Sequence, residues 1–267
     1  MLLRFLLFLS VLGVLNAQEE LYSKTIHPNI EAGMHFSKFD GSISNANSTS
    51  DIKENLNYTN STSSYLALGV WADYKYAPNI KIDYFSHTQN QNSGHNTTIY
   101  IADGVFDANT TITTQTNYTV ANFTIYHDFQ YKGSNINFLR WSFYPGDIEY
   151  YMGLNIKYIR WRFDVEKATN ATTKHWIEIT EIIPLPFIGF QYFYKNFRAF
   201  ANVSALSFKI AKSTNYEIGF AYQVFPNLYI NASYLYEDFQ VTERAADHID
   251  TIKFLTSGNK FSFKYIF

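Results

Sequence analysis

The feature that most constrains the fold is a strict alternation of apolar and polar residues near the C-terminus. The last eight residues, KFSFKYIF, place one set of side chains on each face of an extended chain: Phe261, Phe263, Tyr265 and Phe267 against Lys260, Ser262 and Lys264. Successive side chains of a β-strand point to opposite faces, so a period of two predicts a strand. Residues 197–207, 216–225 and 228–237 alternate in the same way. Four consecutive strands are therefore predicted.

The polar faces of these strands distinguish two kinds of β-protein. A soluble β-sandwich carries many charges on its solvent-facing side, whereas here the second face is rich in Gly, Ala, Ser and Asn. The narrow lumen of a membrane β-barrel requires small and polar side chains, and the surrounding lipid requires apolar ones. Only 16% of all residues are charged and 19% are aromatic, which favours a transmembrane β-barrel, with the sandwich as the alternative.

The rest of the chain completes the predicted barrel. Strands are expected at residues 29–36, 65–74, 80–85, 136–144, 148–158 and 175–194. Pro184 and Pro186 cannot donate to a β-ladder, so they predict a bulge or an end in the last of these strands. The fold class is all-β, an antiparallel up-and-down barrel of ten strands. Twelve strands result if residues 98–106 and 119–130 also span the membrane.

The connections between strands alternate in length. Residues 42–62 and 86–134 are long and rich in Asn and Thr, whereas residues 75–79, 145–147, 195–196 and 226–227 are short. Outer-membrane barrels have short periplasmic turns and longer extracellular loops. The long segments are therefore predicted to be extracellular loops, and both ends of the barrel are predicted to be periplasmic.

The first 17 residues have the pattern of a secretory signal peptide. Arg4 precedes an apolar run at residues 5–15, and small residues lead to Ala17. A transmembrane helix is the alternative, but it requires about 20 apolar residues. We expect cleavage after Ala17, so that residues 18–267 form the barrel domain. The chain has no cysteine, so this domain depends on packing and hydrogen bonds and not on disulfides.

The order of four motifs supports a resemblance to a known class. APNIKIDY, SFYPGDIEYYMGLNIKYI, IPLPFIGFQ and YEIGFAYQVFPNLYINASY follow one another along the chain, before an aromatic final strand. This order resembles Gram-negative outer-membrane β-barrel proteins, and more narrowly a proteobacterial family of unassigned function. The resemblance implies location in the cell outer membrane, with outer-membrane lipid and lipopolysaccharide as partners. It also implies that the barrel-assembly machinery reads Phe261, Phe263, Tyr265 and Phe267 as an assembly signal.

Charged residues on the predicted inner face form a candidate lumen charge network. Its members are five acids, Glu31, Asp83, Glu149, Glu217 and Glu237, and five bases, Lys81, Lys157, Arg198, Lys260 and Lys264. Unpaired charges are costly in a constricted space of low dielectric constant, so we expect these residues to pair across the lumen. The alternative is that the same residues line a water-filled path.

The sequence shows little sign of reaction chemistry. With 21 basic and 23 acidic residues, it has no excess of positive charge for nucleic acid. His35, four residues after Glu31, is the nearest approach to a site, and we interpret it as a polar lumen residue. Asn109 is the one candidate glycosylation site, whereas Asn202 and Asn231 are predicted to face the lumen. No catalytic residue, cofactor or metal ligand is predicted, and the oligomeric state is left open.

Three functions follow from these observations. The leading hypothesis is a structural or surface-interaction barrel, with a lumen largely filled by side chains and external loops as its contact surface. The second is a narrow porin-like channel for small solutes. A lipid-modifying or proteolytic surface enzyme is third, and we expect that the protein is not an enzyme.

Overall fold

The computed structural model describes most of the chain after residue 25. The described residues are 26–44, 49–51, 60–72, 77–95, 98–101, 104–131, 136–138, 141–143, 146–168, 170–207, 211–244 and 249–267. The predicted signal peptide, residues 1–17, lies outside these ranges. None of the described residues belongs to a helix that is long and apolar enough to cross a membrane.

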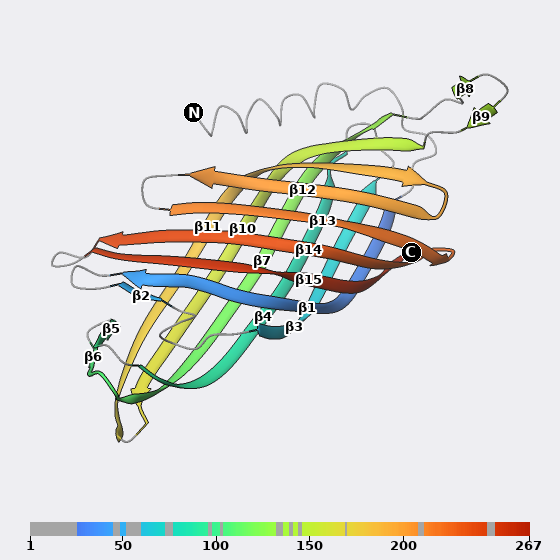
Figure 1. Cartoon of the computed structure of the whole chain (residues 1–267). Coiled ribbons are helices and arrows are strands. Elements are labelled where there is room, and N and C mark those ends of the chain that lie inside the picture. Colours follow the sequence, from blue (N-terminus) through green and yellow to red (C-terminus); the bar gives the residue numbers. More distant parts are fainter. Residues whose placement is uncertain are drawn as a thin grey trace.

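Ten antiparallel strands form a closed ring (Figure 1). In ring order they are β1 (Ile26–Ser44), β3 (Asn60–Ala72), β4 (Asn79–Gly94), β7 (Thr111–Tyr131), β10 (Asp147–Lys167), β11 (Asn170–Tyr194), β12 (Phe197–Ser207), β13 (Ala211–Phe225), β14 (Leu228–Arg244) and β15 (Ile249–Ile266). Pairing of β15 with β1 closes the ring, from Asn29 opposite Ile266 to Ser44 opposite Thr251. The predicted ten-stranded, up-and-down antiparallel barrel is confirmed.

Five short strands lie outside this ring. The strand β2 (Thr49–Asp51) pairs only with the end of β1. Two separate hairpins are formed by β5 (Ile99–Ile101) with β6 (Gly104–Phe106), and by β8 (Ile136–Phe138) with β9 (Trp141–Phe143). Neither hairpin pairs with the main sheet.

The positions of these hairpins correct two predictions. Residues 98–106 lie in the hairpin of β5 and β6 and do not span, so the twelve-stranded alternative is wrong. Residues 136–144 were predicted as a spanning strand, but their place in the ring is taken by β7, which lay largely within the predicted loop 86–134. The outward residues of the first half of β7 are Thr, Gln and Asn. This polar face has the composition of a loop, which is why residues 111–118 were assigned to a loop, whereas residues 119–130 were considered as a further spanning strand and do belong to β7.

Two tight turns agree with the sequence. The pairs 195–196 and 226–227 join β11 to β12 and β13 to β14. Lys195 and Asn227 adopt positive φ angles of 54° and 69°, a conformation that two-residue hairpin turns require. These turns lie at the same end of the barrel as the C-terminus (Figure 1).

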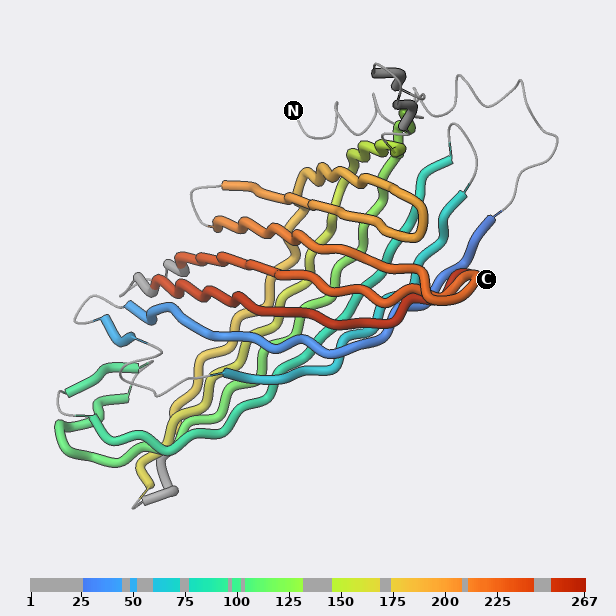
Figure 2. The backbone as a smooth tube through the Cα atoms, turned by 45° about the vertical axis from the view of Figure 1, so that its right-hand side comes forward, coloured from blue at the N-terminus to red at the C-terminus, as the bar shows by residue number. Residues whose placement is uncertain are grey.

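The ring separates into two layers at its other end. The pairing of β11 with β12 covers only residues 187–194 of β11, and β3 pairs with β4 only from residue 65 to residue 70. Beyond these points, β4, β7, β10 and β11 form one layer, which crosses a second layer of β12 to β15, β1 and the start of β3 (Figure 2). This end of the molecule therefore has two stacked sheets.

Pro184 and Pro186 explain one of the two separations. Both keep register with β10, opposite Ile156 and Leu154, and the ladder shifts only later, at Glu166 and Lys167. Residues two apart direct their backbone groups to the same side of a strand, so both prolines leave the same edge of β11 without an N–H donor. Proline is confined to such unpaired edges. The predicted interruption thus lies in the ladder with β12 and not within β11.

A belt of exposed apolar side chains surrounds the half of the barrel that carries the tight turns. Representative members from seven strands are Ile30, Leu68, Ile82, Met152, Ile188, Ile218 and Phe263, each at least 37% exposed. A continuous apolar surface of this extent is unfavourable in water but suits the hydrocarbon of a bilayer. This half is therefore the membrane-spanning part, and the two-layered half projects beyond it.

The alternation reverses where each strand leaves the belt. In β10, Tyr150, Met152 and Ile156 are exposed on the outer face, whereas Trp161 and Phe163 are buried on the inner face. The inner face of the projecting half is thus apolar and its outer face polar. This distribution is typical of strands whose outer face is exposed to water, so the change from an apolar to a polar outer face marks the membrane boundary.

The two layers of the projecting half enclose one apolar core. Phe39 and Phe254 come from one layer, and Phe85, Tyr118 and Trp161 come from the other. The ring centroid of Tyr118 lies 4.5 Å from that of Phe254, and Trp161 lies 5.8 Å from the same ring. We call these five residues the apolar seal, because they close the lumen above the membrane-spanning part.

Candidate functional site: the lumen of the barrel

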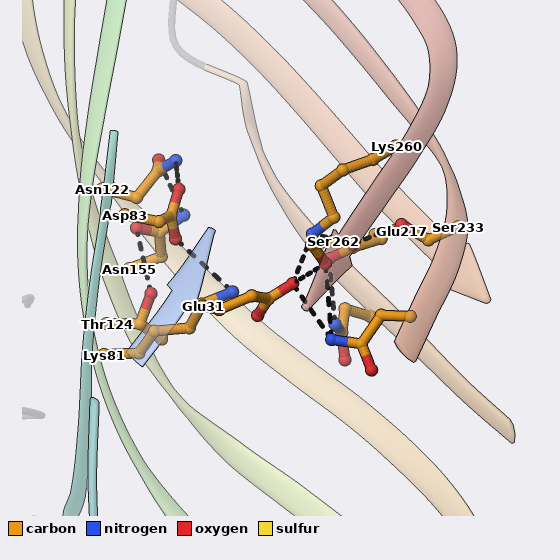
Figure 3. Close-up of polar contacts among 12 residues, drawn as sticks. Glu31, Lys81, Asp83, Asn122, Thr124, Asn155, Glu217, Ser233, Lys260 and Ser262 are labelled. Carbon is orange, nitrogen blue, oxygen red and sulfur yellow. Dashed lines mark hydrogen bonds and ion pairs between the residues drawn. The ribbon is translucent and has the colours of Figure 1, made fainter. Parts of the chain in front are cut away.

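The structure places all ten members of the predicted charge network on the inner face of the membrane-spanning half. Five of them are supplied by β1, β4 and β10, and five by β12 to β15. The residues next to each of them in the strand face outward, as the period of a strand requires. The lumen below the apolar seal is consequently polar along its length, and Figure 3 shows its central contacts.

Lys260 of β15 is the centre of the largest cluster. Its ammonium nitrogen lies 2.5 Å from Glu217 and 3.8 Å from Glu31. Glu31 also accepts hydrogen bonds from the Ser262 hydroxyl and, at 3.2 Å, from the Asn231 side chain (Figure 3). Two carboxylates are thereby held around one lysine, and neutral donors contribute further hydrogen bonds to them, which favours a buried ion cluster.

A second cluster occupies the facing wall. Lys81 and Asp83 of β4 form an ion pair at 3.6 Å, and the Asn122 amide donates to Asp83 at 2.8 Å (Figure 3). The Lys81 side chain is 33% exposed. Water therefore reaches this part of the lumen, and the pair is screened more strongly than the one around Lys260.

The third pair lies directly beneath the apolar seal. Lys157 is fully buried, and its ammonium group lies 2.6 Å from Glu237 and 2.8 Å from the Asn215 carbonyl oxygen. The Tyr118 hydroxyl donates to the same glutamate at 3.2 Å. Because Tyr118 also belongs to the seal, this pair connects the polar lumen to the apolar core above it.

Three predicted members form no ion pair with another described residue. Glu149 accepts a hydrogen bond from Gln130 at 3.5 Å. The guanidinium carbon of Arg198 lies 5.4 Å from the ring centroid of Tyr229, a cation–π distance. Lys264 forms neither a side-chain hydrogen bond nor an ion pair with the described part of the chain. Ion pairs therefore include seven of the ten residues, but only five of these pair between different strands, because Lys81 and Asp83 both lie on β4.

The lumen contains a cavity of about 170 Å³. Lys81, Arg198 and Lys264 line it, together with Glu31 and Glu217. Exposure decreases from the periplasmic end toward the seal: the side chain of Lys81 is 33% exposed, that of Lys260 is 5% and that of Lys157 is 0%. The cavity is thus reached from the periplasm and closed toward the outside.

The structure contains a buried pair of histidines, of which the sequence analysis identified only one. His35 lies inside, as predicted, but its neighbours include His87 of β4, with ring centroids 5.7 Å apart. The Ser37 hydroxyl lies 3.1 Å from Nδ1 of His35 and 3.2 Å from Nε2 of His87. All three residues are at most 1% exposed, so no substrate reaches them. Among the described residues, no three His, Asp or Glu side chains form a metal-binding group.

The structure also shows where the three asparagines considered for glycosylation lie. Asn231 is buried against Glu31, and Asn202 accepts a hydrogen bond from Tyr151 at 2.6 Å. Both therefore face the lumen, as the alternation indicates. Asn109 is exposed in the turn between β6 and β7, with a φ angle of 64°. Its glycosylation stays a prediction.

The closed antiparallel ring, the apolar belt and the polar lumen define an outer-membrane β-barrel, which places the protein in the outer membrane of a Gram-negative cell. Among solved structures, the outer membrane protease OmpT of Escherichia coli has a TM-score of 0.51 at 10% identity, over 93% of this chain and 99% of that one.

Two further structures have lower scores. The translocator domain of the autotransporter NalP from Neisseria meningitidis is 13% identical, with a TM-score of 0.40 over 97% and 94% of the two chains. Neisserial surface protein A is 10% identical, with a TM-score of 0.35 over 92% and 99%. No protein-family model and no curated protein matches the sequence. At these identities the likeness concerns the fold alone.

Proposed function

We propose that this protein is a non-conducting outer-membrane barrel with a structural or surface-interaction role. The observation that carries the proposal is the apolar seal, which joins both layers across the lumen. An ion that crossed this region would have to lose its hydration among Phe39, Phe85, Tyr118, Trp161 and Phe254. Burial of an uncompensated charge in apolar surroundings costs far more than thermal energy. Hydrophobic constrictions act as closed gates for this reason.

The projecting half supplies the contact surface. The outer faces of β4 and β7 carry uncharged polar side chains above the belt, including Thr88, Asn90 and Asn117. On the neighbouring strands, Trp176 is 56% exposed and the Arg162 guanidinium lies 5.4 Å from its ring centroid. Exposed aromatic and arginine side chains are enriched in protein interfaces. This face is suited to contacts with lipopolysaccharide or with molecules outside the cell.

The channel alternative has the periplasmic cavity in its favour, because its walls are polar and charged. Conductance in planar bilayers separates the two functions. We expect the refolded wild-type protein to be silent and a Tyr118→Ala/Phe254→Ala double variant, which shortens the seal, to conduct. Phe261→Ala, on the lipid face, is the matched control and is expected to remain silent. Wild-type conductance that changes on Lys81→Gln or Asp83→Asn would replace this proposal with the channel.

We further propose that the protein has no enzymatic activity and that the barrel-assembly machinery recognises its final strand. The buried position of Ser37, His35 and His87 supports the first statement. The aromatic residues Phe261, Phe263, Tyr265 and Phe267 support the second, since all four are exposed on the lipid face of β15 and at its end. The backbone N–H of Phe267 also donates to the carbonyl of Pro28 at 2.8 Å, which anchors the terminus to β1.

A further inference from the structure

We propose that Arg198 and Lys264 form a binding site for a small phosphate-bearing anion that reaches the lumen from the periplasm. Both side chains line the same cavity of about 170 Å³. They come from β12 and β15, whose residues lie far apart in the sequence, so only the closed barrel brings them together. This site goes beyond the proposed surface role, which concerns the opposite end of the molecule.

Tyr229 links the two cations in space. The guanidinium of Arg198 lies 5.4 Å from its ring centroid, and Tyr229 is the direct register partner of Lys264 in the β14–β15 ladder. Cross-strand partners have Cβ atoms about 5 Å apart. Arg198 and Lys264 therefore extend into the cavity on the same side, around one aromatic ring.

Neither cation forms an ion pair within the described part of the chain. The Nε atom of Arg198 is buried and has no hydrogen-bond acceptor. Glu31 is the register partner of Lys264, but its carboxylate is engaged by Lys260, Ser262 and Asn231 (Figure 3). Two neighbouring positive charges without an anion are costly in a confined lumen. A bound anion would remove this cost.

The other acidic residues near this part of the lumen also have hydrogen-bond or ion-pair partners. Glu217 pairs with Lys260 at 2.5 Å and accepts a hydrogen bond from Ser233 at 2.7 Å. Glu149 lies on β10 and accepts from Gln130. Internal neutralisation of Arg198 and Lys264 would require one of these carboxylates to move toward them. An external anion requires no such rearrangement.

The route to the site comes from the periplasm. Arg198 and Lys264 are half-buried, whereas the charged residues nearer the apolar seal are almost completely buried. A soluble anion can therefore diffuse in from the periplasmic end, and the seal prevents access from outside. The strands around the site belong to a continuous ladder from β12 to β1, so the hydrocarbon region gives no lateral access.

The two residue types select the chemistry of the ligand. Arginine presents a planar fork of N–H donors that matches two oxygens of a phosphate, and lysine adds a compact positive charge. A singly charged carboxylate would balance only one of the two cations. A phosphate group carries up to two negative charges near neutral pH, so it balances both.

The experiment is calorimetric titration of the refolded full barrel, in non-ionic detergent at low ionic strength, with inorganic phosphate. We expect one saturable site with a dissociation constant of about 1 mM. Loss of one charged hydrogen-bonding group should weaken binding about tenfold in Arg198→Gln and in Lys264→Gln. Lys253→Gln is the matched control, because Lys253 lies on the same strand but is exposed outside the lumen.

Circular dichroism of each variant verifies that the barrel is folded before the titration. Because neutralisation of a lumen cation can impair folding, Lys264→Arg provides a second variant that preserves the charge and is expected to retain binding. A parallel arm uses micelles that contain phosphatidylglycerol, to separate soluble phosphate from a lipid head group. The proposal is overturned by absence of saturable phosphate binding, by equal affinity of Arg198→Gln and wild type, or by binding of the lipid alone.

Discussion

The pair of Lys157 and Glu237 offers the most direct test of how the lumen is stabilised. Lys157 is 0% exposed, and its ammonium group lies 2.6 Å from Glu237 and 2.8 Å from Asn215. Lys157→Met keeps a long side chain but removes the charge. Among the described residues, Glu237 would then retain hydrogen bonds from Tyr118 and Thr256, at 3.2 Å and 3.4 Å, as compensation for a buried negative charge.

The expected loss is large. Removal of one partner of a buried ion pair costs about 3–5 kcal/mol, because the other charge is left without compensation. Lys81→Met is the matched control, since Lys81 is 33% exposed and lies 3.6 Å from Asp83. For such a solvated pair, the expected cost is at most about 1 kcal/mol. The difference between these two variants measures the effect of burial on an ion pair in the same lumen.

The assay is reversible urea unfolding of the barrel in phospholipid vesicles, followed by tryptophan fluorescence. The free energy of unfolding is extrapolated linearly to zero urea. A double-mutant cycle with Glu237→Gln completes the test, and we expect the double variant to lose about 2–3 kcal/mol less than the sum of the single variants. If Lys157→Met costs no more than Lys81→Met, or if the two substitutions are additive, this account of the lumen is wrong.

Two further predictions concern topology and assembly. The chain has no cysteine, so single cysteines can be introduced as labels. A membrane-impermeant maleimide applied to intact cells should label Asn90→Cys, which lies above the belt, but not Asn227→Cys, which lies in a tight turn. The reverse labelling pattern would invert the assigned orientation. Deletion of Phe267 should lower the amount of folded protein in the outer membrane several-fold, because it removes the final aromatic residue. Phe225→Ser is the control, because Phe225 is 64% exposed and Phe267 is 66% exposed. An equal loss of folded protein in both variants would show that general hydrophobicity matters and not the aromatic residue at the end of the strand.

The lipid-facing side of the barrel could be predicted because alternation is a local property. Each strand of the C-terminal part shows the period directly, so Phe261, Phe263 and Tyr265 were assigned to the outer face without knowledge of their neighbours. The same logic placed Lys157 and Lys260 inside. The prediction failed for the first half of β7, because a strand that passes from lipid into water no longer has an apolar outer face throughout, and residues 119–130 were considered only as part of a twelve-stranded barrel.

The apolar seal was missed although a sequence signal for it exists. In the stretch KYIRWRFDVEK, the alternating apolar residues occupy even-numbered positions up to Tyr158 and odd-numbered positions from Ile159 onward. The predicted strand ended at residue 158, where the alternation shifts, so the core formed by the residues beyond it was not predicted. The reversal indicates the point at which the environment of the outer face changes from lipid to water.

The sequence alone thus determined an antiparallel membrane barrel, its outer belt and the charged character of its interior, because all three depend only on which side of a strand each residue faces. The tertiary structure decided which strands close the ring, where the ring divides and which charges pair. Those outcomes depend on register between distant segments: Asn231 meets Glu31 across 200 residues, and Tyr118 meets Glu237 across 119. A local pattern carries no information about such partners, so Arg198 and Lys264 became distinct from the other cations only once the barrel had closed.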